Sequence, residues 1–104
     1  MSGSDRPDAS LAWEAMAINA ADNVAVALCD IEGDVHVRIG DAVRVIHVAA
    51  PIPMGHKFAT RDLTAGEPVL KYGECIGITT APVAAGEHVH VHNLESRRAR
   101  RKAG

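Results

Sequence analysis

Apolar and polar residues alternate with a period of two along much of the chain. Every second residue from Val35 to Ile39 is apolar, and a second alternating run covers residues 43–48. An earlier run, residues 24–28, sets Val and Leu between alanines. Because successive side chains of a β-strand point to opposite faces of a sheet, this pattern predicts three strands.

Turn-forming residues divide these runs. Glu32-Gly33-Asp34 predicts a turn before the strand that starts at Val35. The prolines at positions 51 and 53 are expected to end the preceding strand, since proline cannot donate a ladder hydrogen bond. We therefore expect residues 51–59 to form a loop. A loop can present functional side chains, and this one carries His56 and Lys57.

The chain also contains an internal repeat. Residues 63–69 (LTAGEPV) are echoed by residues 83–89 (VAAGEHV), and residues 31–35 form a weaker copy. In each strong copy a glycine can supply the positive φ of a tight turn, after which a strand begins. Many short strands joined by glycine turns predict a small barrel-like or clip-like all-β fold.

The two ends of the chain differ from this pattern. Residues 1–10 are polar and are expected to be disordered. Residues 11–21 are rich in alanine, and propensity alone favours a helix there with Ser10 as its cap. One domain is expected over residues 11–94. Residues 95–104 form a basic tail, interpreted as a solvated end, with a partner-docking segment as the alternative.

Composition limits the size of the core and the classes of partner. The chain has 104 residues, which suffices for one domain, and only 3% are aromatic although 47% are hydrophobic. Small aliphatic side chains remove less area from water than rings do, so we expect modest stability and a benefit from a partner surface. The net charge of −2 provides no field that would attract nucleic acid or an anionic membrane.

Cysteine use and the lack of targeting patterns indicate a cytoplasmic protein. Cys29 and Cys75 are too few for a disulfide scaffold and too far apart for a metal-binding pair, so we expect reduced thiols in the core. The sequence shows neither a signal-peptide pattern nor the roughly 20 apolar residues that span a bilayer.

Residues 88–93 (HVHVHN) carry the most informative polar pattern. Strand alternation would place His88, His90 and His92 on one face. Same-face neighbours lie roughly 6–7 Å apart, so a neighbouring pair can share a metal ion, whereas binding by all three is harder. A closed structural zinc site is not expected, because no further ligand motif is present. The alternatives are an exposed polar strand face and a metal or anion site.

Three further side chains are chemical candidates. Lys57 and Lys71 can pair with carboxylates as point charges, and His56 can act as a general acid or base because its pKa lies near physiological pH. The alternative for each is an ordinary solvated side chain. Asp22-Asn23 is interpreted as a local turn, since both residue types bond to nearby backbone.

Four motifs in order resemble the N-terminal SAF domain of the altronate and galactarate dehydratase family. They are DNVAVA at residues 22–27, IPMGHKFA at 52–59, KYGECIG at 71–77 and GEHVHVHN at 86–93. The resemblance covers about residues 16–94. It implies a small β-clip fold of the antifreeze-protein-like type, and it favours a strand over a helix at residues 15–19.

In fused members of that family this module precedes a larger catalytic region, whereas here the sequence ends soon after the last motif. The resemblance therefore implies a small subunit, as in two-subunit altronate dehydratases and sulfolactate sulfo-lyases. Its expected partner is a large catalytic subunit of the same family. The isolated chain could also self-associate.

The implied activity is a lyase reaction that eliminates water or sulfite from a sugar acid or a related hydroxy acid. The implied cofactor is a divalent metal, iron(II) first and manganese or magnesium otherwise. Two alternatives are a non-catalytic carbohydrate or anion-binding module and a structural subunit. The expected site residues are His56 for catalysis, Lys57, Lys71 and Asn93 for substrate binding, and His90 and His92 for the metal.

Overall fold

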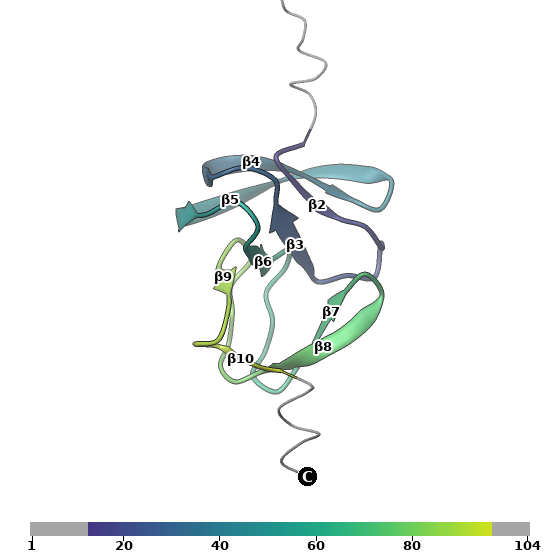
Figure 1. Cartoon of the computed structure of the whole chain (residues 1–104), viewed down its shortest axis with the longest axis vertical. Coiled ribbons are helices and arrows are strands. Elements are labelled where there is room, and N and C mark those ends of the chain that lie inside the picture. Colours follow the sequence, from purple (N-terminus) through teal and green to yellow (C-terminus); the bar gives the residue numbers. More distant parts are fainter. Residues whose placement is uncertain (1–12, 97–104) are drawn as a thin grey trace, which may run out of the picture.

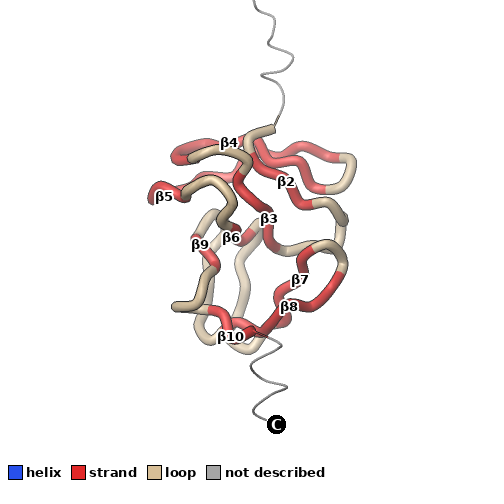
Figure 2. Tube along the Cα trace, in the orientation of Figure 1, coloured by secondary structure: helices blue, strands red, loops and turns tan. Residues whose placement is uncertain are grey.

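The computed structural model describes residues 13–96, which form nine strands joined by loops (Figures 1 and 2). Within this range no helix is present, so the all-β prediction is confirmed and no segment forms an apolar helix of membrane-spanning length. The strands are β2 (Ala15–Ala17), β3 (Val24–Ala27), β4 (Ile31–Ile39), β5 (Ala42–Ile52), β6 (Lys57–Ala59), β7 (Pro68–Lys71), β8 (Glu74–Thr79), β9 (His88–Val89) and β10 (Leu94–Ser96).

Some expectations about the chain ends fall outside the described residues. These are the disordered segment 1–10, the Ser10 cap and the basic residues of the tail. The first two residues of the expected tail, Glu95 and Ser96, belong to β10.

The strands form two sheets. The larger has the order β5-β4-β2-β3-β6-β9, in which only β2 and β4 run parallel, and the smaller has the order β10-β8-β7. The expectation of a helix on propensity alone was wrong, and the strand favoured by the resemblance is present as β2. Ala15 and Ala17 lie fully buried in the middle of the large sheet, so strand pairing overrides their helical propensity.

The large sheet curls until its two edges meet. The guanidinium of Arg44 on β5 donates a hydrogen bond to the carbonyl of Thr60, which follows β6 (2.6 Å). Gly86, before β9, lies so close to the carbonyl of His47 on β5 that a Cβ would overlap the oxygen. The sheet therefore forms a half-barrel with a seam between β5 and β9.

Two clusters of buried side chains make the core, and Phe58 is their only aromatic residue. This confirms the prediction of a core built from small aliphatic side chains. The first cluster lines the large sheet, and the second fills the space between the two sheets. The second cluster consists of Val24, Ala59, Leu63, Val69, Val83 and Val89.

Two local predictions were wrong. Gly33 does not form a turn, because β4 runs through it with a bulge and pairs with β5 on both sides. Its φ of +82° provides the bend. The loop expected at residues 51–59 is also shorter, because β5 continues to Ile52 and residues 57–59 pair with β3 and β9 as β6.

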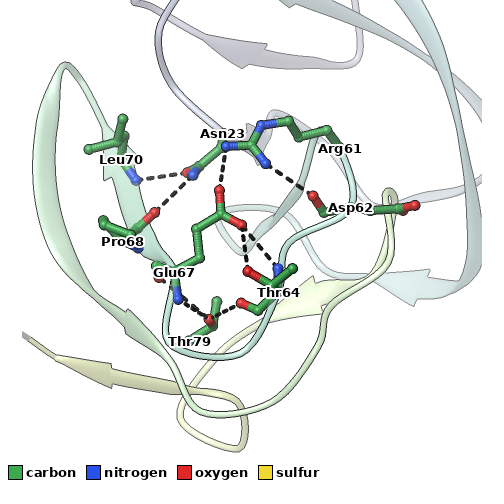
Figure 3. Close-up of polar contacts among 8 residues, drawn as sticks. All are labelled: Asn23, Arg61, Asp62, Thr64, Glu67, Pro68, Leu70 and Thr79. Atoms are coloured by element: carbon green, nitrogen blue, oxygen red, sulfur yellow. Dashed lines mark hydrogen bonds and ion pairs between the residues drawn. The ribbon is translucent and has the colours of Figure 1, made fainter.

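The two repeat copies form equivalent corners, as predicted. Gly66 and Gly86 have φ angles of +81° and +85°. Glu67 accepts the backbone N–H of Thr64 (3.0 Å) in the first corner, and Glu87 accepts that of Ala84 (2.9 Å) in the second. An antiparallel bridge joins Leu63 to Val83, so the corners face each other. Figure 3 shows the first corner, where Arg61 also pairs with the Glu67 carboxylate.

The cysteines are free, but the expected core position was wrong. Cys29 is exposed and Cys75 is partly exposed. Cys29 directly follows Leu28, beyond the end of β3, where the chain leaves the sheet.

Candidate functional site

Three imidazoles gather where β6 and β9 pair. His56 precedes β6 and His88 starts β9, and the pairing of Phe58 with His88 brings the two segments together. His56 Nδ1 lies 3.0 Å from His88 Nε2. The His90 ring stacks on that of His88 with an interplanar angle of 9° and a centroid distance of 5.2 Å. One ligand nitrogen from each ring lies within 4.8 Å of the other two, an arrangement that could hold a metal ion.

A buried asparagine holds the His-bearing turn. Asn93 is 4% exposed, its Oδ1 accepts the backbone N–H of His90 (2.9 Å) and its Nδ2 donates to the carbonyl of His88 (2.9 Å). Strand β9 ends at Val89, so the prediction of one continuous strand over residues 88–93 was wrong. Val91 is 82% exposed whereas Val89 is buried, so alternation does not continue past Val89.

The fourth imidazole, His92, is less closely involved. Its ring lies 5.7 Å from that of His88, with an angle of 49° between the planes. His88 and His92 also line a groove of about 570 Å³. The groove follows the open part of the seam, where small side chains form both walls. Its other lining residues are His47, Ala49, Ala50, Pro51, Ala84, Ala85, Gly86 and Glu87.

Two lysines extend this basic region. Lys57 follows His56 at the start of β6 and is partly buried. Burial lowers the pKa of Lys57, and the positive charge of Lys71 on β7 lowers it further. The two like charges leave a positive potential that an anion such as a carboxylate would neutralise.

The position of Lys71 depends on a buried carboxylate. Asp22 accepts the backbone N–H groups of Tyr72 (2.8 Å) and Gly73 (2.7 Å), which form the turn that follows β7. The neighbouring Asn23 binds the backbone of Pro68 and Leu70 (Figure 3). Interpreting this pair as a local turn missed its main role, which is to clamp the β7–β8 hairpin to β3.

The surroundings of His88 disfavour its charged form. Its pKa is lowered, first by burial and then by the charges that His56, His90, His92 and Lys57 carry when protonated. Neutral imidazole is the form that binds metal ions, because its ring nitrogen then has a free lone pair.

The structure groups His56 and His90 around His88, whereas Lys71 acts on Lys57 and its ammonium lies over the ring of Tyr72. His56 and His90 contact His88 directly, and the charge of Lys57 acts on it. The Asn93 amide is engaged with backbone. The sequence-based site omitted His88, since strand alternation treats the three histidines of the segment alike and gives no sign that His56 approaches one of them.

Comparison with known proteins identifies the family of the chain. Residues 13–97 match the altronate/galactarate dehydratase SAF domain. The chain is 43% identical over 79 residues to altronate dehydratase of Escherichia coli, a match that covers 76% of this chain and 16% of that protein.

Smaller relatives match over a larger part of their own length. The chain is 45% identical over 58 residues to the (2R)-sulfolactate sulfo-lyase subunit alpha of Chromohalobacter salexigens, covering 56% of this chain and 62% of that subunit. For the subunit alpha of Paracoccus pantotrophus the identity is 47% over 49 residues, covering 47% of this chain and 73% of that protein. The chain belongs to the altronate/galactarate dehydratase SAF domain family.

Proposed function

We propose that this chain is the small subunit of a lyase and that it borders the active site of a separate large subunit of the same family. The lyase would eliminate water or sulfite from a sugar acid or related hydroxy acid. The observation that carries the proposal is the cluster of His56, His88 and His90. The ammonium of Lys57 acts on His88, and that of Lys71 acts on Lys57. The similarity to sulfo-lyase alpha subunits supports the role of a subunit.

The chemistry of elimination explains why such groups are useful. The C–H bond next to a carboxylate breaks and its proton passes to a base, while its electron pair forms a C=C bond and the adjacent carbon loses hydroxide or sulfite. The resulting enol takes up a proton on carbon to give the 2-keto acid. Negative charge develops on the substrate carboxylate, where Lys57 and Lys71 would stabilise it. A bound divalent metal would polarise the carboxylate or the leaving group. His56 would act on a proton or bind beside the metal, and Asn93 would position the histidines.

Reconstitution tests this proposal. The chain is co-purified with a large subunit of the family and assayed with altronate, galactarate and sulfolactate for release of a 2-keto acid or sulfite. We expect turnover only from the complex, about a hundredfold or greater loss of kcat for His56→Ala, and a raised KM for Lys57→Met and Lys71→Met. His36→Ala is the matched control, since His36 is an exposed imidazole on β4 that pairs with Glu14.

Two outcomes would contradict the proposal. One is full turnover by the isolated chain, and the other is wild-type turnover by the His56→Ala complex. Binding of a sugar acid without turnover in any complex would favour a carbohydrate or anion-binding module. Wild-type kinetics for the His56 and both lysine variants would favour a structural subunit.

A further inference from the structure

We infer that His56, His88 and His90 form a transition-metal site that belongs to this chain alone. The inference narrows the role of His56 in the proposed function to that of a ligand. The metal ligands expected from the sequence were His90 and His92. The inferred ligands include His88 and leave out His92. Because the site lies within one polypeptide, it can be tested without the large subunit.

The distances between the ring nitrogens carry the inference. Two nitrogens bound to one ion at about 2.1 Å lie roughly 3.0–3.4 Å apart for bond angles between 90° and 110°. His56 Nδ1 and His88 Nε2 are already 3.0 Å apart. One ring nitrogen of His90 lies within 4.8 Å of a ring nitrogen of each of the other two histidines, and the His90 ring is exposed, so its rotation would complete three-point binding.

The backbone beneath the three rings is built to hold them. The pairing of β6 with β9 fixes the segment of His56 against that of His88. The amide of Asn93, which is almost fully buried, bonds the backbone of both His88 and His90. Strand pairing and two internal hydrogen bonds therefore hold the backbone from which the three rings extend.

The donor set indicates the kind of metal. In the described residues no carboxylate or thiol joins the group, so all three donors are imidazole nitrogens. Imidazole suits iron, cobalt, nickel, copper and zinc, whereas magnesium requires oxygen ligands. The residues therefore fit iron(II), the metal expected from the resemblance, and do not fit magnesium. Three protein ligands leave at least one position for water or substrate, as in catalytic sites.

His92 is excluded from the set by its position. It is not one of the three histidines whose ring nitrogens lie within 4.8 Å of one another, and its ring centroid lies 5.7 Å from that of His88. We assign it to the wall of the groove. It thus provides a matched control, because it is an exposed histidine in the same turn.

Titration of the full-length isolated chain tests the inference. Cobalt(II) and zinc(II) are added to the wild type, and binding is followed by visible absorption for cobalt and by calorimetry for both. We expect one ion per chain, and at least tenfold weaker binding for each of His56→Gln, His88→Gln and His90→Gln. We expect His92→Gln and His36→Gln to remain within about twofold of wild type, and magnesium not to compete.

Imidazole nitrogen shifts in NMR provide a second measurement that requires no substitution. Zinc should move the signals of His56 Nδ1 and His88 Nε2 and leave those of His36 in place. Circular dichroism and thermal melts establish that each variant is folded. Stoichiometric binding lost in His92→Gln but kept in His90→Gln would overturn the ligand set, and no binding at millimolar metal would overturn the site. If the isolated chain binds the metal but the reconstituted complex shows no lyase activity, the proposed function is contradicted and the metal site is not.

Discussion

Asp22 accepts the backbone N–H of Gly73 at 2.7 Å, although 51 residues separate them in sequence. The same carboxylate accepts the N–H of Tyr72 (2.8 Å), whose φ of +57° is unusual for a residue with a side chain. Asp22 is 5% exposed, so water has little access to compete for these hydrogen bonds. The position of Lys71, one residue before Tyr72, thus depends on Asp22.

We expect Asp22→Asn to destabilise the chain by about 2–3 kcal/mol, because an amide offers one acceptor where the turn presents two donors. Urea unfolding measures the change. Asp41→Asn is the control, since Asp41 is exposed in the turn between β4 and β5. Equal stability of the two variants would show that the Asp22 clamp contributes little.

A second prediction concerns the two lysines. In Lys71→Met the pKa of Lys57 should rise toward 10.5, since a neighbouring positive charge that disfavours the ammonium form is removed. It should remain below that value, because the burial that contributes most to the shift is unchanged. NMR titration of the labelled lysine side chain gives the pKa. The control Arg61→Met removes a cation from the first repeat corner and should leave Lys57 unaffected.

These predictions depend on contacts that the sequence did not show. The alternation around Val35 and Val37 predicted β4, because burial of one sheet face leaves a period of two in the sequence. The repeat predicted both corners, because the glycine of each turn and the glutamate that accepts a backbone N–H lie within four residues of one another. Local chemistry of this kind can be predicted from one segment at a time.

The candidate site could be predicted only in part, because its central contact joins two distant segments. The proximity of His56 to His88 follows from the pairing of β6 with β9, whose register is not visible in either segment alone. The end of β9 at Val89 depends on the hydrogen bonds of Asn93, so alternation suggested a longer strand than the one that forms. Family resemblance identified the segments, and the fold placed them against each other.

A third prediction concerns pH. The pKa of Glu67 is lowered, chiefly by the hydrogen bond from Arg61 and then by the backbone N–H of Thr64. The unfolded chain therefore binds this proton at a higher pH than the folded chain does. The stabilisation is complete above the unfolded pKa, near 4.3, and is lost as pH falls through the lower folded pKa.

Glu67→Gln should thus reduce stability more at pH 7 than at pH 3, as measured by urea unfolding at both values. Glu87→Gln is the matched control, because Glu87 accepts the equivalent N–H of Ala84 and has no arginine partner among its described contacts. The stability difference between the two variants should narrow at acid pH. A difference that stays constant with pH would contradict the role given to Arg61.

The last prediction uses the repeat to test closure of the half-barrel. Gly66 and Gly86 occupy equivalent corners with φ angles of +81° and +85°, so an alanine suffers similar backbone strain at either position, about 1–2 kcal/mol. Their surroundings differ. A Cβ at Gly66 meets no atom within 4 Å, whereas one at Gly86 would overlap the carbonyl oxygen of His47 across the seam.

Gly86→Ala should therefore destabilise the chain by at least about 2 kcal/mol more than Gly66→Ala, because strand β5 must move away from the β9 corner or the corner must distort. Urea unfolding gives both values. Since His88 follows two residues after Gly86, the same substitution should also weaken cobalt binding, whereas Gly66→Ala should leave the ion bound. Equal effects of the two substitutions on stability would show that β5 and the β9 corner can separate at little cost. The close packing of Gly86 on His47 would then not hold β5 beside the histidines.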